Sequence, residues 1–170
     1  EHMDYIRRTC HPLRLTELVD AMEHDRLPRR GVVVTFDDGY VDNLTEAYPI
    51  LEKTEIPATV FVTAGSIGES CEFWWDDLER ILLLRAQLPS EMQLCLHDQH
   101  FNFPIGSLPV QQRRTFHRLL HQLLRPLPAS EQRRLLCTLA EWAGELPPPR
   151  ANYRPMRADE VVQLTRSGLV

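Results

Sequence analysis

The stretch GVVVTFDDGY, residues 31–40, decides the fold of this chain. Its first six residues are mostly apolar and β-branched, and they lead directly to two adjacent carboxylates, Asp37 and Asp38, and a glycine. A short run that is apolar on both faces is typical of a buried strand in a parallel sheet. Functional side chains of such sheets gather where the strands end. Asp37 and Asp38 are therefore the first candidate site residues.

The residues after this stretch predict a helix and a second strand. Residues 44–53 carry apolar side chains at helical spacing, with Asp42 or Asn43 placed to cap the helix. The following IPATVFVTAG repeats the pattern of the first strand. Strand, helix and strand at this spacing predict a βαβ unit. Residues 32–36 and 59–63 should then be neighbouring parallel strands.

The rest of the chain breaks this alternation. FWWDDLERILLLRAQ predicts a helix, MQLCLHDQHFNFPI a β-hairpin about Asp98 and Gln99, and residues 110–124 and 130–143 two amphipathic helices. RADEVVQLTRSG predicts a last helix with Gly168 as its C-cap. We therefore divide the chain into βα units at residues 1–71, a helical insertion at 72–150, and a return helix at 151–170.

Composition excludes several classes of function. The chain has 170 residues, 43% of them hydrophobic and 25% charged, as expected for a globular protein. Its net charge of -5 provides no basic patch for nucleic acid, and no apolar run approaches the roughly 20 residues of a membrane span. Four cysteines without a C-x-x-C pair are expected to be small, buried or half-buried thiols.

The paired carboxylates admit two interpretations. A D-D-G sequence after a strand is suited to a tight turn, because aspartate favours turns and glycine accepts a positive φ. A turn needs only one aspartate, however, and a second carboxylate adds like-charge repulsion that a bound cation would relieve. One carboxylate could then hold a metal while its neighbour accepts a proton from water.

TFDDGYVDN, together with YPILEKTEIPATVFVTAG, resembles the first motif and following βα unit of the polysaccharide deacetylases, the NodB-homology enzymes of carbohydrate esterase family four. The resemblance covers about residues 13–68, and MRADEVVQLTRSGLV looks like the helix before that family's second motif. It implies an α/β fold, the N-terminal part of a distorted (β/α) barrel with a mainly helical insertion. Tyr40, where many members have proline, points toward the branch acting on poly-N-acetylglucosamine-like or cell-surface glycans.

The resemblance also implies a reaction. The family removes acetyl groups from N-acetylglucosamine polymers with one divalent metal, most often zinc. Carried over to this sequence, Asp37 would be the general base and Asp38 a metal ligand. The partner would be an N-acetylated glycan, and the location the cell envelope or the extracellular space. No signal peptide is visible in the opening EHMDYIRRT, which is typical of a helix.

The sequence departs from the family in its second half. The family's other two metal ligands are histidines of an H-[ST]-x-x-H motif after the next strand. In this chain, SGLV, the last four residues, stands where that strand should begin. These histidine ligands and the later motifs are absent from the chain. We therefore expect an N-terminal fragment that is inactive by itself, with a truncated and a naturally short product both left open.

Other residues could substitute for the missing ligands, but each has a simpler explanation. His117 and His121 stand four apart in HRLLH, which favours a helix surface, and His97 and His100 stand in a hairpin turn. Asp76 and Asp77 suit a helix N-terminus. Trp74 and Trp75 could stack on sugars but are better explained as anchors of the insertion.

Two other functions remain as alternatives. The chain could be a non-catalytic glycan-binding or interaction domain that keeps the deacetylase scaffold. A haloacid-dehalogenase-like phosphatase also places an aspartate after an apolar strand, but it needs Asp-x-Asp spacing, whereas Asp37 and Asp38 are adjacent. Exposed sheet edges in part of a barrel also make self-association an expectation.

Overall fold

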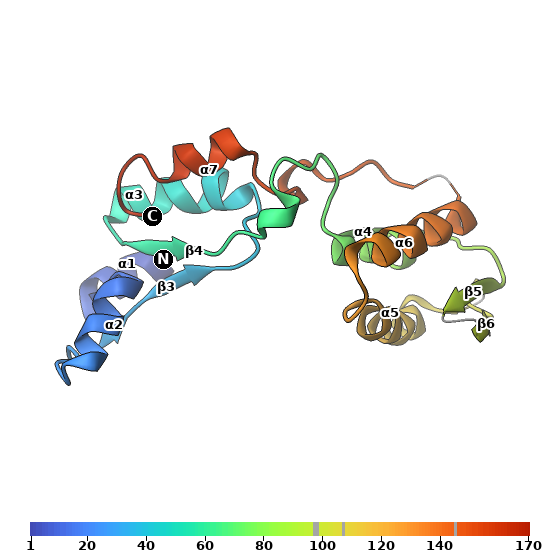
Figure 1. Cartoon of the computed structure of the whole chain (residues 1–170), viewed down its shortest axis with the longest axis horizontal. Coiled ribbons are helices and arrows are strands. Elements are labelled where there is room, and N and C mark those ends of the chain that lie inside the picture. The colour runs from blue at the N-terminus through green and yellow to red at the C-terminus, as the bar shows by residue number, and fades with distance from the viewer. Residues whose placement is uncertain (97–98, 107, 145) are drawn as a thin grey trace. The chain divides into compact units, whose positions relative to one another are not determined.

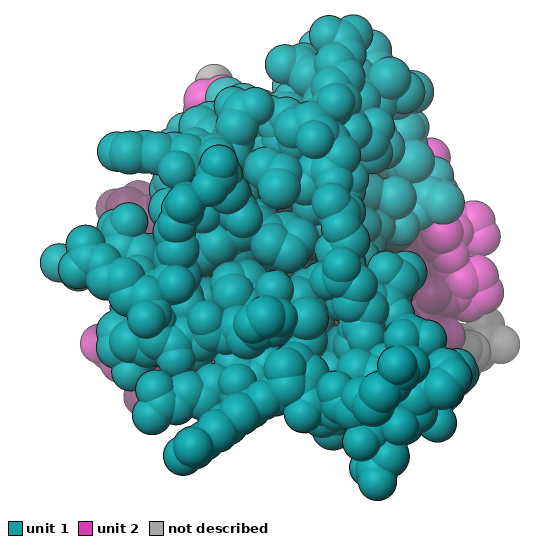
Figure 2. Space-filling model, turned by 90° about the vertical axis from the view of Figure 1, so that its left-hand side faces the viewer, with its two compact units in different colours: residues 1–71, 150–170 teal, residues 72–149 magenta. Residues whose placement is uncertain are grey.

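The computed structural model describes residues 1–96, 99–106, 108–144 and 146–170. The chain folds as two compact units (Figures 1 and 2). Unit 1 comprises Glu1–Cys71 and Arg150–Val170, and unit 2 comprises Glu72–Pro149. Each unit has apolar residues buried in its own interior.

Unit 1 is built on short parallel strands. β1 (His11–Pro12) pairs with β2 (Gly31–Val32), and β3 (Val34–Phe36) pairs with β4 (Ala58–Val60). The predicted parallel neighbours are thus confirmed, although both strands are shorter than expected (Figure 1). The backbone N–H of Ala58 also donates to the carbonyl of Leu169 (3.0 Å), so the C-terminal segment lies against β4.

The prediction that the first strand is buried on both faces is wrong. Val34 and Phe36 are half-buried and pack against the core, but Thr35 between them is exposed. Phe61, which follows β4, is also exposed at 50%. Alternate residues of a strand point to opposite faces, so helices cover one face of this sheet and the other faces solvent within unit 1.

The crossover from β3 to β4 is helical, as predicted, but it begins as a π-helix. η1 (Asn43–Ala47) leads into α3 (Tyr48–Thr54), and the N–H of Tyr48 donates to the carbonyl of Asn43. Pro49 lies in the first turn of α3. Because proline has no N–H, it is compatible with a change of hydrogen-bond pattern at this position.

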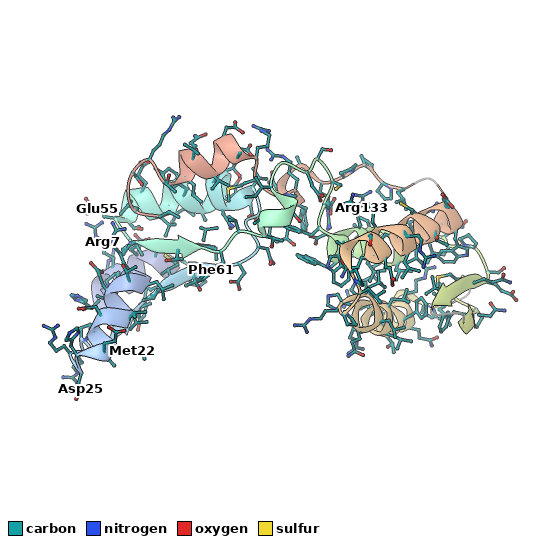
Figure 3. The ribbon with its side chains drawn as sticks, viewed as in Figure 1. Arg7, Met22, Asp25, Glu55, Phe61 and Arg133 are labelled. Carbon is teal, nitrogen blue, oxygen red and sulfur yellow. The ribbon has the colours of Figure 1, made fainter. Side chains whose placement is uncertain are left out.

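Unit 1 has three further α-helices, α1 (His2–Thr9), α2 (Leu15–Glu23) and α7 (Ala158–Leu164), and two short 3-10 helices, η2 (Ala64–Ser66) and η3 (Ala151–Tyr153). Arg7 of α1 donates to Glu55 and to the carbonyl of Thr54 (both 2.6 Å), which ties α1 to the end of α3 (Figure 3). The predicted C-cap at Gly168 is wrong, because α7 ends at Leu164 with Thr165 as its C-cap. Gly168, with φ 69°, instead closes the next turn.

Two apolar clusters hold the helices of unit 1 to the sheet. In the first, Leu44 and Leu164 meet with Val60 packed against them, so η1 and α7 share one face of β4. In the second, Leu51 and Ile56 lie against Val34 and Phe36 of β3. Val170 contacts both clusters. The helices thereby fix the position at which β3 ends.

Unit 2 combines three helices with a hairpin. The helices are α4 (Trp74–Leu82), α5 (Val110–Leu124) and α6 (Ala129–Ala143), and β5 (Met92–Leu96) pairs antiparallel with β6 (Gln99–Phe103). The hairpin strands and the amphipathic helices are therefore confirmed. Asp98 of the predicted turn lies outside the described residues. The predicted pair of amphipathic helices, α5 and α6, buries a row of leucines that includes Leu120 and Leu135.

The expectation of buried thiols is wrong for two cysteines. Cys71 and Cys137 are exposed, while Cys10 is half-buried. The side chain of Cys95 lies outside the described residues. Cys137 lies in α6 at a position that does not face the core, so helical register, not the apolar character of the thiol, decides its exposure.

In the described part of the chain, no helix is long and apolar enough to span a bilayer.

Candidate functional site

Asp37 and Asp38 lie at the carboxyl end of β3, in a turn with an unusual backbone. Asp38 has φ 68° and Gly39 has φ 79°, so two successive residues adopt the left-handed region. Aspartate tolerates this region better than most residues, and glycine enters it freely. The N–H of Gly39 donates to the carbonyl of Asp37 (2.8 Å), which closes the turn.

The segment after β4 holds this turn from one side. The N–H of Thr63 donates to the carbonyl of Asp38 (3.1 Å). A Cβ atom at Gly39 would lie 2.8 Å from Cγ1 of Val62, closer than such atoms approach in proteins. Glycine is therefore required at residue 39 both by its φ angle and by the packing of Val62.

The segment before α7 holds the turn from the other side. The N–H of Val41 donates to the carbonyl of Arg154, and the N–H of Met156 donates to the carbonyl of Gly39 (both 3.0 Å). Tyr40 and Pro155 form the antiparallel bridge between these two hydrogen bonds. Residues more than a hundred positions away in the sequence thus fix the backbone around the two aspartates.

An ion pair anchors that segment to α7. Arg154 donates two hydrogen bonds to the carboxylate of Glu160, each 2.7 Å long, and the backbone N–H of Arg157 donates a third at 2.8 Å. The hydrogen bonds from Arg154, together with that from Arg157, lower the pKa of Glu160 to about 2. The Glu160 side chain is 9% exposed and that of Arg154 is 24% exposed, so this pair is a partly buried link between α7 and the D-D-G turn.

The electrostatics of the turn favour a cation. Asp37 is exposed and Asp38 is half-buried. Burial, and then the negative charge of Asp37, raise the pKa of Asp38 above its ordinary value. A divalent cation would offset both effects, so the two carboxylates suit a metal. Among the residues that the structure describes, no three or more His, Cys, Asp and Glu side chains form a metal-binding cluster.

The histidines considered as substitutes lie in unit 2. His117 and His121 are half-buried on α5, and the ring of Trp74 lies 4.8 Å from that of His121. Burial and then His121 lower the pKa of His117, whose Nε2 atom is buried without a hydrogen-bond partner in the described structure. His97 and the side chain of His100 lie outside the described residues.

The acidic and aromatic residues of the WWDD sequence form the first turn of α4. Asp76 and Asp77 lie in its first turn, and Asp77 accepts a hydrogen bond from Arg80 (2.8 Å). Trp74 packs against the core of unit 2, while the ring of Trp75 stacks on Phe73 with centroids 4.7 Å apart. These contacts agree with a helix N-terminus and aromatic anchors.

A pocket that was not predicted from the sequence lies next to the D-D-G turn. It lies in unit 1 and is lined by Tyr40, Asp42, Glu46, Asn152 and Tyr153. A partial signal was present, since Asp42 and Glu46 stand four apart at the start of the crossover helix and so share a helix face. The other wall comes from residues 152 and 153, which no local pattern connects to Tyr40.

Residues 24–95, which include the D-D-G turn, match the family model described as polysaccharide deacetylase. This segment is similar to part of a polysaccharide deacetylase domain. The matched segment covers both strands of the βαβ unit and the crossover between them. The resemblance that the D-D-G motif indicated is thus confirmed for this part of the chain.

Curated deacetylases match a shorter part of the chain. The putative polysaccharide deacetylase YxkH of Bacillus subtilis (strain 168) is 46% identical over 48 residues, which are 28% of this chain and 17% of that protein. A poly-beta-1,6-N-acetyl-D-glucosamine N-deacetylase of Staphylococcus aureus (strain N315) is 40% identical over 57 residues, 34% of this chain and 20% of that protein. The aligned segments therefore span at most a fifth of these deacetylases.

A solved structure is similar over a larger part of the chain. It is the BpsB deacetylase domain from Bordetella bronchiseptica, 22% identical, with a TM-score of 0.34 over 69% of this chain and 38% of that one.

Proposed function

We propose that this chain contributes the D-D-G part of a metal-dependent N-deacetylase that removes acetyl groups from N-acetylglucosamine-type glycans. One observation carries the proposal. Two carboxylates stand at the carboxyl end of a parallel strand, in a turn held from both sides, inside the segment that matches the deacetylase family model. A glycan substrate is supported by the staphylococcal relative, whose name specifies poly-beta-1,6-N-acetyl-D-glucosamine.

The two aspartates have different roles in this proposal. Asp38 is the metal ligand, because its half-buried carboxylate is the one whose ionised form needs a compensating positive charge. Asp37 is the general base, because it is exposed beside that position and can reach a water molecule. When bound, a divalent cation, for which zinc is our choice, supplies charge that polarises the acetyl carbonyl and activates water.

The fold assignment belongs to the same proposal. Residues 1–71 would be the first βα units of a distorted (β/α) barrel, residues 72–150 the insertion, and residues 151–170 the return helix. The parallel strands and the hydrogen bond from Ala58 to Leu169 support a sheet that continues past β4. The site would then gain further ligands from outside the described residues, and the glycan would be met in the cell envelope or outside the cell.

Zinc affinity and turnover test the roles of the two aspartates. We expect Asp37→Asn to retain zinc in the full-length gene product and to lose roughly 10²–10⁴-fold in turnover, since it removes a general base. Asp38→Asn should weaken zinc binding, and excess zinc should restore part of the activity. If Asp37→Asn lost zinc while Asp38→Asn kept it, the two roles would be reversed.

The 170-residue chain by itself is the control for the full-length product. With added zinc it should show no measurable deacetylation of N-acetylglucosamine oligomers. Activity of this chain alone would mean that its own residues complete the site, with His117 and His121 the first to substitute. A full-length product that bound the glycan without hydrolysing it would instead favour a non-catalytic glycan-binding domain.

A further inference from the structure

The pocket lined by Tyr40, Asp42, Glu46, Asn152 and Tyr153 has no role in the chemistry assigned to Asp37 and Asp38. It begins at Tyr40, two residues beyond Asp38, so the two features belong to one stretch of backbone. Tyr40 bridges to Pro155, and this pairing brings residues 152 and 153 across from the start of η1. The hydrogen bonds that position the D-D-G turn therefore also form the pocket.

The aromatic walls of the pocket are held in defined orientations. The rings of Tyr40 and Tyr153 meet edge to face, with centroids 6.4 Å apart and planes at 85°. The guanidinium carbon of Arg150 lies 3.5 Å from the centroid of the Tyr153 ring, a cation–π contact that keeps this ring in place. Fixed aromatic rings beside polar side chains form a surface on which a sugar ring can pack.

The polar walls carry negative charge. Asp42 and Glu46 are acidic, and Asn152 adds an amide that can donate or accept. Burial and the charge of Glu46 raise the pKa of Asp42, while a hydrogen bond from the backbone of Asn43 partly opposes them. A ligand that brings a positive charge between the two carboxylates would relieve this repulsion.

We propose that this pocket binds a glucosamine residue, a sugar whose free amine is protonated, within a partially deacetylated glycan. The inference rests on the proposed function, because it supposes that the substrate is an N-acetylglucosamine-type chain. The sugar ring packs against Tyr40 and Tyr153, and the ammonium pairs with Asp42 and Glu46. The chain would thereby favour glycans that already carry free amines, next to the position where Asp37 and Asp38 act.

Binding to the 170-residue chain without added metal tests this inference. Oligomers of glucosamine and of N-acetylglucosamine, matched in length, would be titrated at low ionic strength and followed by calorimetry or by NMR. We expect the glucosamine oligomer to bind about fivefold or more tightly than its acetylated counterpart, as for a partly exposed ion pair. The preference should decrease in high salt, and it should disappear at a pH at which the amine is neutral.

Variants locate the binding site. Asp42→Asn and Glu46→Gln should each reduce the affinity for the glucosamine oligomer about threefold to fivefold and leave that for the acetylated oligomer unchanged. Glu23→Gln, an exposed acidic residue of α2, is the matched control and should change neither. Tyr153→Ala should weaken the binding of both oligomers, because it removes the ring against which the sugar packs. Circular dichroism would show whether this variant keeps its fold.

The results separate this inference from the proposed function. Equal affinity for the two oligomers, or a preference that survives in Asp42→Asn and Glu46→Gln, would overturn the inference even if the full-length product deacetylates glycans. A full-length product without deacetylase activity, together with a glucosamine preference that depends on Asp42 and Glu46, would refute the proposed function and leave the pocket assignment standing.

Discussion

At the scale of single residues, Asp38 lies in a position that suits a metal and does not suit the metal-free chain. Burial and the neighbouring Asp37 raise the pKa of Asp38, so its ionised form is disfavoured in the folded state. A carboxyl group with a raised pKa favours folding below its unfolded pKa and ceases to do so as the pH rises through its folded pKa. Ionised Asp38 therefore lowers the stability of the metal-free chain at neutral pH.

Asp38→Asn should raise the free energy of unfolding of the metal-free chain at pH 7 by about 0.5 kcal/mol, a small value because the group is partly solvated. Asparagine accepts the positive φ of this residue as well as aspartate does. Urea denaturation at pH 7 and pH 3 would measure the difference, which should vanish at pH 3. Asp25→Asn, at an exposed residue with φ 54°, is the control and should have no effect.

Gly39→Ala should lower the free energy of unfolding by about 1–3 kcal/mol, because it combines a positive φ with a contact on Val62. Gly65→Ala is the matched control, since a Cβ there would have no atom within 4 Å. Thermal denaturation of both variants measures the effect. Equal stability of the two would show that neither the positive φ nor the contact with Val62 makes alanine costly at residue 39.

At the scale of elements, the link between α7 and the D-D-G turn depends on the ion pair of Arg154 and Glu160. Glu160 has a pKa of about 2 in the folded chain against 4.5 ordinarily. A group with a lowered pKa stabilises the folded state at pH values above its unfolded pKa. That stabilisation is lost as the pH falls through its folded pKa. The ion pair should therefore stabilise the chain at neutral pH and cease to do so between pH 4.5 and about 2.

Glu160→Gln should lower the free energy of unfolding at pH 7 by about 1.5–3 kcal/mol, the range for a lost hydrogen bond to a charged group. The difference from the wild type should shrink as the pH falls below 4.5, which denaturation at several pH values would measure. Asp159→Asn removes an exposed partner of Arg157, 3.3 Å away, and should cost less than about 0.5 kcal/mol. An effect of Glu160→Gln that did not depend on pH would contradict the ion-pair explanation.

At the scale of the whole molecule, apolar side chains remain exposed where β4 ends. Phe61, which is labelled in Figure 3, is 50% exposed. Val62 and Ile67 are each 37% exposed. Short strands with open edges and an apolar border are prone to pair with other chains. Self-association of the chain through this surface stays a prediction.

Phe61→Lys should reduce self-association of the 170-residue chain, because it places a charge in this apolar surface. Sedimentation velocity over a range of protein concentrations would measure the fraction of oligomer. Leu84→Lys replaces an equally exposed leucine of unit 2, 47% exposed, and is the control. A chain that stayed monomeric at all concentrations, or equal effects of the two variants, would count against this surface.

The sequence by itself determined the local features of this protein. The β-branched runs around Val34 and Thr59 were sufficient for two parallel strands, and the spacing of apolar residues was sufficient for the helices between and after them. The resemblance to the deacetylase family also followed from a short motif, since TFDDGY is an unbroken stretch. These features depend on residues that are neighbours in the chain, so a linear pattern carries them.

Only the tertiary structure decided what the D-D-G turn packs against. The exposure of Thr35, the clash that excludes a side chain at Gly39, and the hydrogen bonds from residues 154–156 depend on segments that are distant in the sequence. The pocket of Tyr40 and Tyr153 was missed for the same reason. Its two walls meet through the bridge of Tyr40 to Pro155, and a contact between segments more than a hundred residues apart leaves no periodic signal in either of them.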